Sequence, residues 1–232
     1  MDSGQNAVQD KRSVDEQAEE TCLEQNPIAQ RVIPKQTRAH KRIASILDAT
    51  EILLAQNANV TTSTIAKQAE IPVGSIYRYF PNIMGIYSAL FKKLNDRMHL
   101  QIAITFKNAD EATDGPVAWR DLFRRIMAVV SDAYIQYPAL GVLLLMVSSP
   151  ELRPIKKASN ATMANAIEGR YQAGLNGFHG GDPKIVATTV IELISWFELS
   201  VFVNKGELEN SEALYAEGLK VIEAYLSLYL TD

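Results

Sequence analysis

The sequence predicts an all-α protein in which a three-helix N-terminal domain with a helix-turn-helix motif precedes a helical bundle, about nine helices in all. Apolar residues recur at helical spacing along most of the 232-residue chain, and no strand-like alternation occurs. Residues 61–80 outline two short amphipathic helices around a tight turn. With 47% hydrophobic and 22% charged residues, the chain has the composition of a folded globular protein.

Charge is distributed unevenly along the chain. The net charge is −5 over residues 1–30, +6 over residues 31–100 and −5 over residues 101–232. A polyanion would be attracted to the middle block and repelled by the outer two. The distribution predicts a nucleic-acid interface confined to residues 31–100, which the overall net charge of −4 conceals.

Cysteine and histidine usage argues against a disulfide, a metal site or a cofactor. Cys22 is the only cysteine, and the three histidines lack the spacing of metal ligands. The N-terminus is acidic and has no apolar stretch of the kind found in a secretory signal. Glu192 and Glu198 interrupt the longest apolar run, residues 186–203, so we expect a buried helix there instead of a membrane span. A cytoplasmic protein without a membrane partner is expected.

The first two elements are a tail and a helix. Residues 1–35 are polar, acidic and aperiodic, which predicts a disordered tail that ends in a basic arm. A 3.6-residue apolar stripe then predicts a helix from Ile43 to about Gln56, which Asn57 and Asn59 end. The cations of the arm are Arg31, Lys35, Arg38, Lys41 and Arg42.

After the short helix pair, Asn82 is the predicted N-cap of a longer helix. This helix carries Ile86, Leu90, Leu94 and Met98 at near-helical spacing and should continue through residue 106. The three glycines of residues 176–182 predict a mobile connection. Breaks at proline, glycine and asparagine divide the remainder into helical stretches at residues 117–137, 139–148, 151–175, 183–204 and 211–230.

The second short helix of the motif has an inward and an outward face. Ile76 and Phe80, at i and i+4, should face inward with Val73 nearby. Hydroxyl groups and a guanidinium on the other face suit a major groove, and either Thr61 or Thr62 could cap the first helix. Two short helices with an aromatic pair also occur in ordinary helical cores, an alternative that spacing alone leaves open. The outward residues are Gly74, Ser75, Arg78 and Tyr79.

The pattern Thr-Thr-x-x-Ile-Ala-x-x-Ala, followed by Val-Gly-Ser-Ile-Tyr-Arg-Tyr-Phe, resembles the TetR family of transcriptional regulators over about residues 37–95. The resemblance implies an all-α homodimer that binds DNA through residues 36–98 and dimerises and binds a ligand through residues 99–232. The DNA contacts that the resemblance implies are Thr61, Thr62, Pro72, Val73, Ser75, Tyr77, Arg78 and Tyr79. We add Gly74, because it allows the backbone to approach DNA closely, and Lys41, because of its positive charge.

Three positions depart from the family pattern. Glu70 stands at a turn where glycine is usual, and a positive φ there costs roughly 1 kcal/mol for a residue with a Cβ. Pro72 replaces a small hydroxyl residue, which removes a side-chain cap. Ile83 replaces a lysine that commonly contacts phosphate, so one charge contact per half-site is lost.

The last two helices are the predicted dimer interface. Residues 183–204 are apolar nearly all round, and residues 211–230 have a wide apolar face in which Gly218 allows close approach. These features suit a symmetric four-helix interface between two copies, and the alternative is a monomeric core.

A ligand pocket is expected among the large side chains of the central helices. Each of these side chains is more often an ordinary core residue. Glu192 stands out because a carboxylate inside an apolar run needs a partner, either an internal donor or a polar group of a ligand. The candidates are Trp119, Phe123, Met127, Tyr134, Met146, Met163, Tyr171, Glu192 and Trp196.

Three function classes follow from these observations. The first is a ligand-responsive one-component regulator, expected to be a repressor, that binds a near-palindromic operator as a dimer in response to an unknown small-molecule effector. The second is a helix-turn-helix DNA-binding protein without a ligand, controlled by a partner protein or by its abundance. An enzyme is not expected, since the chain has no nucleophile elbow, phosphate loop or acid and base signature.

Overall fold

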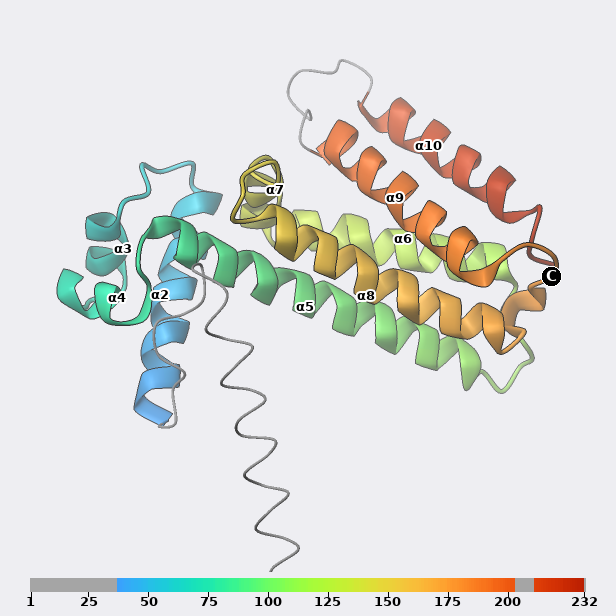
Figure 1. Ribbon diagram of the computed structural model, residues 1–232, viewed down its shortest axis with the longest axis horizontal. Helices are drawn as coiled ribbons and strands as arrows, with labels where there is room; N and C mark the ends of the chain where they lie inside the picture. Colours follow the sequence, from blue (N-terminus) through green and yellow to red (C-terminus); the bar gives the residue numbers. More distant parts are fainter. Residues whose placement is uncertain (1–36, 203–210, 232) are drawn as a thin grey trace, which may run out of the picture.

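The computed structural model describes residues 37–202 and 211–231, and the secondary structure within these ranges is entirely helical. Helices α2, α3 and α4 form a small group at one end of the molecule, and α6 to α10 form a longer body (Figure 1). Helix α5 runs from the one into the other. The bounds are α2 Thr37–Ala55, α3 Thr62–Gln68, α4 Val73–Tyr79, α5 Ile83–Asp110, α6 Trp119–Gln136, α7 Pro138–Leu144, α8 Arg153–Gln172, the 3-10 helix η1 Leu175–Gly177, α9 Pro183–Phe202 and α10 Ser211–Leu226.

Helix α2 begins earlier than the sequence predicts, at Thr37 instead of Ile43. Ala39 extends the apolar stripe by one turn and packs against the core, so the helix continues upstream. Arg38, Lys41 and Arg42 therefore lie on a helix, and their assignment to an unstructured arm is wrong. The predicted tail, with Arg31 and Lys35, lies outside the described residues.

The end of α2 confirms the predicted stop at Asn57. Asn57 has a φ of 51°, in the left-handed region that asparagine tolerates better than most residues. The backbone N–H of Asn57 donates to Leu54 O at 3.1 Å, and the N–H of Ala58 donates to Leu53 O at 3.0 Å. This pair of bonds is a Schellman motif, which satisfies carbonyls that the helix end leaves open.

The larger hydrophobic core runs without a break from the small helical group into the body. Ile65 and Ile76 are completely buried, as are Leu90 and Leu94 on α5 and Leu143 on α7. The predicted boundary between domains, at residue 98, falls inside α5, whose residues pack against both parts. A rigid helix with a shared core therefore connects the two parts.

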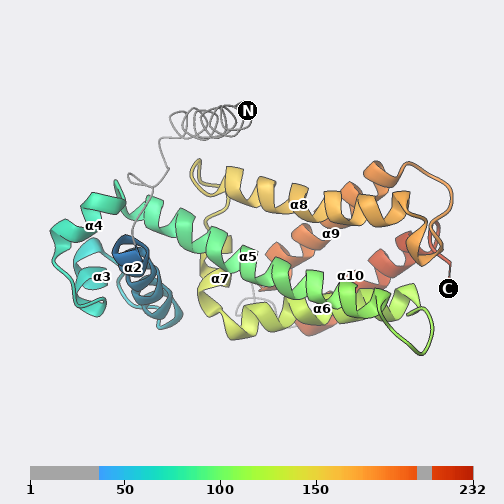
Figure 2. The same cartoon turned by 90° about the horizontal axis from the view of Figure 1, so that it is seen from below.

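Helix α5 lies between α6 and α8 in the body (Figure 2). Its predicted cap is confirmed, since Asn82 Oδ1 accepts from the N–H of Gly85 at 2.9 Å. The predicted stripe is confirmed too: Ile86, Leu90 and Leu94 are completely buried and Met98 is 6% exposed. A second core cluster fills the far end of the body between α6, α8, α9 and α10.

The connection between α8 and α9 is packed, contrary to the mobile loop that its glycines predicted. Phe178 stacks on Tyr171 with ring centroids 4.5 Å apart. The N–H of His179 donates to Tyr229 O at 2.8 Å, and Thr231 Oγ1 donates to Gly177 O at 3.2 Å. The segment after α10 holds this loop in place, a contact between distant residues that local composition cannot reveal.

Helices α6 and α7 meet at a sharp bend. Pro138 occupies the first turn of α7, where its missing N–H costs nothing. In the described part of the chain no single helix is long and apolar enough to cross a membrane, and α6 with α7 reaches that threshold only as a pair bent by 95°.

The contact between Gly218 and Phe197 gives a test of the packing of α9 on α10. A Cβ at Gly218 would lie 2.6 Å from Phe197 Cδ1 and Cε1, so Gly218→Ala should destabilise the protein by about 1–3 kcal/mol through overpacking. Gly169 on α8 has nothing within 4 Å of such a Cβ, so Gly169→Ala should gain about 0.5–1 kcal/mol. Urea unfolding of both variants at one protein concentration measures the difference. Equal effects of the two substitutions would contradict the packing described.

Candidate nucleic-acid interface and internal cavity

Helix α3 starts with a reciprocal cap at Thr61. The N–H of Thr64 donates to Thr61 Oγ1 at 3.1 Å, and the N–H of Thr61 donates to Thr64 Oγ1 at 2.8 Å. Thr61 is therefore the cap, and Thr62 is the first residue of the helix. The remaining free N–H groups of this first turn are available to an anion.

The turn between α3 and α4 contains two of the unusual residues. Glu70 has a φ of 54°, so a residue with a Cβ occupies the left-handed position predicted at this turn. The N–H of Ile71 donates to Ala66 O at 3.0 Å and closes the helix end. Pro72 precedes α4 as its N-cap with a φ of −61° and provides no side-chain hydrogen bond.

Helix α4 presents a narrower outward face than the sequence predicted. Ile76 and Phe80 are 0% and 1% exposed, which confirms the inward face. Tyr79 is only 8% exposed, so its predicted outward orientation is wrong: it lies three residues after Ile76 and shares the buried face. Val73, expected near the core, is 37% exposed.

The two short helices are joined on the outer surface by a hydrogen bond. Thr62 Oγ1 and the Tyr77 hydroxyl lie 3.1 Å apart. Gly74 and Arg78 are exposed beside this pair, and Ser75 is half-buried. We refer to the outer surface formed by the exposed residues Pro72, Val73, Gly74, Tyr77 and Arg78 and the half-buried residues Thr61, Thr62 and Ser75 as the reading surface.

The cations of α2, α4 and α5 differ in how they are paired. On α5, Lys93 Nζ lies 2.6 Å from Asp48 Oδ1 and Lys92 Nζ lies 2.7 Å from Asp96 Oδ2, so part of the positive charge of this region is neutralised. Lys41 and Arg78 are exposed and have no ion pair within the described ranges. Ile83, at the start of α5, is half-buried against the core and contributes no charge.

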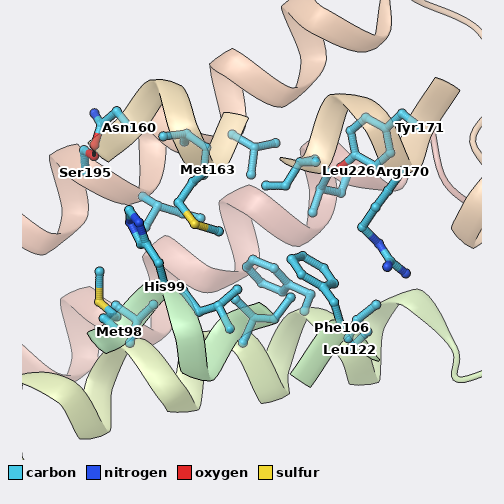
Figure 3. A pocket seen from close by; sticks show the side chains of 18 of the residues that line it. Met98, His99, Phe106, Leu122, Asn160, Met163, Arg170, Tyr171, Ser195 and Leu226 are labelled. Atoms are coloured by element: carbon cyan, nitrogen blue, oxygen red, sulfur yellow. Dashed lines mark hydrogen bonds between the residues drawn. The ribbon is translucent and has the colours of Figure 1, made fainter. Parts of the chain in front are cut away.

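The body contains a pocket of about 100 Å³ that is partly open to solvent, which we call the cavity. Figure 3 shows Arg170 and Tyr171 at one end, Asn160, Ser195 and His99 at the other, and Met163 between them. Its walls come from α5, α6, α8 and α9, with Leu226 of α10 and Asn176 of η1. Apolar and aromatic side chains form most of the lining.

Four of the predicted ligand residues line this cavity: Trp119, Phe123, Met163 and Tyr171. Met127 is buried in the second core cluster, and Tyr134 and Met146 pack against the first. Trp196 is 58% exposed on the outside of α9, so its placement in a pocket is wrong.

The predicted burial of Glu192 and its place in this pocket are wrong, because Glu192 is exposed, and of the two partners expected for it the structure shows an internal donor. Its Oε1 accepts from Asn160 Nδ2 at 3.3 Å; Asn160 lines the cavity and Glu192 does not. The buried carboxylate of the same apolar run is Glu198, which is 4% exposed and lines the cavity. Glu198 lies seven residues after the buried Ile191 and so shares its face, but α9 is apolar on nearly every side, so the sequence alone does not indicate which face is buried.

Glu198 is held by partners on two other helices. Lys156 Nζ of α8 donates to Glu198 Oε2 at 2.8 Å, and the side chains are 16% and 5% exposed. The hydroxyl of Tyr134 on α6 also hydrogen-bonds Glu198. Burial, and then the negative charge of Glu198, raise the pKa of Tyr134, so this phenol remains protonated as a donor.

A chain of hydrogen bonds fixes the histidine at the polar end of the cavity. Asn95 Nδ2 donates to Phe91 O at 2.8 Å, so Asn95 Oδ1 is the atom that accepts from Ser159 Oγ at 3.1 Å. Ser159 has then used its only proton, and His99 Nε2, 3.0 Å away, must donate to it. Neutral His99 therefore carries its proton on Nε2. Desolvation lowers its pKa, which favours this neutral form.

The other end of the cavity carries a second paired cation. Arg170 makes a bidentate contact with Asp110 at 2.6 and 2.7 Å and lies over the Phe106 ring at 4.4 Å. The hydrogen bonds from Arg170 lower the pKa of Asp110. One face of α8 carries Lys156, Ser159, Met163 and Arg170, which all line the cavity. Their helical spacing in the sequence could have identified the three polar residues as cavity residues together with Met163, which was the only one of the four predicted.

Within the described residues, no group of three or more His, Cys, Asp or Glu side chains could hold a metal ion.

Comparison with known families locates one match, to the bacterial regulatory proteins of the tetR family, over residues 46–90. These residues extend from the middle of α2 into the first part of α5 and include the reading surface. No curated protein matches the chain.

Solved structures share the fold over most of the chain. A transcriptional regulator from Cytophaga hutchinsonii is 17% identical with a TM-score of 0.65, over 82% of this chain and 99% of its own. SmeT, the repressor of the Stenotrophomonas maltophilia multidrug efflux pump SmeDEF, is 18% identical with a TM-score of 0.57, over 82% and 91%. The regulator FadR from Bacillus subtilis, solved with stearoyl-CoA, is 20% identical with a TM-score of 0.55, over 77% and 96%.

The left-handed residue at the turn gives a test of local strain. Glu70→Gly should stabilise the protein by roughly 0.5–1 kcal/mol, because relief of the strained φ exceeds the greater chain entropy of glycine. Glu70→Ala removes the carboxylate but keeps the strain, so it should give no such gain. Thermal unfolding of both variants measures the effect, and a gain with alanine as large as with glycine would assign it to charge instead.

The depressed pKa of His99 predicts a loss of stability in acid. The unfolded chain takes up a proton at His99 near its ordinary pKa of 6.5, and the folded protein does so only at lower pH. Stability should therefore fall as pH drops below about 6.5, and His99→Gln, which keeps a donor for Ser159, should flatten this dependence. Melting temperatures at about pH 7.5 and pH 5.5 test it. An unchanged pH dependence in the variant would contradict the buried neutral imidazole.

Proposed function

Because the chain belongs to the TetR family of transcriptional regulators, which are DNA-binding proteins and not enzymes, we propose that it is a ligand-responsive repressor. In this proposal a homodimer binds a near-palindromic operator through two copies of the reading surface. A small molecule in the internal cavity then lowers the affinity for the operator. The affinities for ligand and operator are reciprocally coupled, as linkage requires.

The observation that carries this proposal is the position of α5. Its first half packs in the core of the helix-turn-helix group through Ile86 and Leu90. Its second half supplies Met98, His99 and Phe106 to the cavity wall. A ligand that shifts the second half of one rigid helix must also shift the first half, and with it the spacing of the two α4 helices in a dimer.

Exposed apolar residues on α9 and α10 support the dimer. On α9, Ile185 is 64% exposed and Trp196 58%; Val221 of α10 is 52% exposed, and Leu228, just after the end of α10, is 65% exposed. Large apolar side chains gathered on two adjacent helices are typical of an interface. Gly218, expected to approach a partner, instead packs on Phe197 of its own chain.

The cavity distinguishes this function from the alternative of a DNA-binding protein without a ligand. A body that served only to dimerise could be filled with side chains, as protein cores usually are. Here a cavity of about 100 Å³ lies against α5 and is lined at both ends by polar groups. This arrangement favours ligand control over control by a partner protein.

Arg78 is the side chain whose removal tests the reading surface. Genomic fragments selected by the purified protein would supply the operator, and Arg78→Ala should bind it at least about tenfold more weakly because one base or phosphate contact is lost in each half-site. Lys157→Ala removes the same charge from an exposed position on α8 and should leave binding unchanged. Fluorescence anisotropy at fixed salt measures both.

Sedimentation of the same proteins is the control for assembly. Wild type and both variants should sediment as dimers, since neither side chain lies on the exposed faces of α9 or α10. Unchanged operator affinity in Arg78→Ala would refute the reading surface as assigned. A monomer that binds the operator as tightly would refute the dimer.

A further inference from the structure

We propose that the cavity takes a small, uncharged and mainly apolar molecule that carries a hydrogen-bond acceptor. This inference rests on the proposed function only in taking the cavity as the effector site. It concerns the chemical class of the ligand. Three features of the cavity define this class: the paired charges at its two ends, the Trp119 N–H that has no acceptor in the described part of the chain, and the volume.

The cation at one end of the cavity is already neutralised. Lys156 Nζ lies 2.8 Å from Glu198 Oε2, and both side chains are largely buried. An anionic ligand that bound Lys156 would leave the Glu198 carboxylate without its counter-charge in a desolvated site. A cationic ligand that bound Glu198 would strand Lys156 in the same way.

The cation at the other end is neutralised as well. Both terminal nitrogens of Arg170 contact Asp110, and one of them also lies 3.3 Å from Asn176 Oδ1. The guanidinium face covers the Phe106 ring. Its planar donor set is therefore used within the protein, and a ligand carboxylate would have to displace Asp110 to replace these bonds.

A donor without an acceptor supplies the polar part of the proposal. Trp119 is 2% exposed and lines the cavity, and its Nε1–H has no hydrogen-bond partner among the described residues. A buried N–H of this kind is rare, because most find an acceptor. The N–H has almost no accessible surface, so a carbonyl, ether or hydroxyl oxygen of a ligand reaches it only after a small shift of the Trp119 ring, and then satisfies it without introducing a charge.

The remaining lining and the volume restrict the ligand further. Between the polar ends the walls are apolar, with Ile102, Leu122, Phe123, Met163 and Ile191 among them. The volume of about 100 Å³ is below the roughly 150 Å³ of an engineered cavity that binds benzene, so it takes one small group, and any larger ligand extends into the open side of the cavity. An aromatic or branched aliphatic amide, ketone or alcohol fits both limits.

A charge series of nearly constant shape tests the inference. Phenylacetamide is uncharged with a carbonyl acceptor, phenylacetate is its anionic isostere, and 2-phenylethylammonium is a cation of similar length. Ligand-observed NMR titrations of the full chain near neutral pH would give the three dissociation constants. Phenylacetamide should bind at least about tenfold more tightly than either ion, because neither ion finds an unpaired counter-charge.

Two variants change the charge balance in a predictable direction. Glu198→Gln leaves Lys156 unpaired, so phenylacetate should gain about tenfold in affinity relative to phenylacetamide. Asp110→Asn leaves Arg170 without its counter-charge at a position where the replaced side chain is 41% exposed, and it should give a gain of the same sign even if Glu198→Gln fails to fold. Glu192→Gln removes an exposed carboxylate from the same helix as Glu198, outside the cavity, and should change neither ratio.

The Trp119 donor is tested separately. Trp119→Phe keeps an aromatic ring but removes the N–H, so it should reduce the preference for phenylacetamide over ethylbenzene, which has no acceptor. An unchanged preference would overturn the role of this donor.

The outcomes separate this inference from the proposed function. Tighter binding of either ion by the wild type, or binding of none of the series, overturns the uncharged class. Binding of phenylacetamide without any change in operator affinity leaves the ligand class standing and counts against ligand control of DNA binding.

Discussion

The fold depends on one constraint: helix α5, Ile83–Asp110, has to satisfy two different environments without a break. Its first half completes a core of aliphatic side chains beneath the helix-turn-helix, where Leu90 and Leu94 are fully buried. Its second half forms one wall of a cavity in the body. Because a helix transmits rotation and translation along its axis, the proposed ligand control needs no hinge between the cavity and α4.

The body meets a second constraint through polar groups. Glu198 on α9 is held by Lys156 of α8 and Tyr134 of α6, so three helices meet at one buried carboxylate. Such a site is stable only while every member is paired, which makes the relative positions of the helices specific. The Ser159 and His99 contacts do the same between α8 and α5. The cavity thus has polar ends that are largely satisfied internally and apolar walls between them.

The relation between sequence and structure differs between the two parts of the molecule. In the helix-turn-helix, short-range chemistry decides much of the geometry: a threonine cap at Thr61 or Thr62 and a helix cap at Asn82 were predictable from local residue type, whereas the left-handed position of Glu70 was implied by the resemblance to the TetR family. The burial of Tyr79 also follows from short-range geometry, because it lies three residues after Ile76 on the same face of α4. In the body, the misplaced residues were Glu192 and Trp196, both on α9, where apolar residues on every side of the helix obscure which face is buried.

By itself the sequence determined the all-helical class, the approximate helices, the DNA-reading motif and its basic surroundings, because these depend on helical periodicity, capping residues and charge within short stretches. Four cavity residues were also identified from their large side chains, and the helical spacing of the polar residues Lys156, Ser159 and Arg170 on α8 could have added three more. Only the tertiary structure decided which of two glutamates is buried, which tryptophan lines the cavity, and how the loop after α8 is held by Tyr229 and Thr231. These outcomes depend on contacts between residues far apart in the chain, and side-chain burial is set by the helices that pack around a residue and not by its neighbours in sequence.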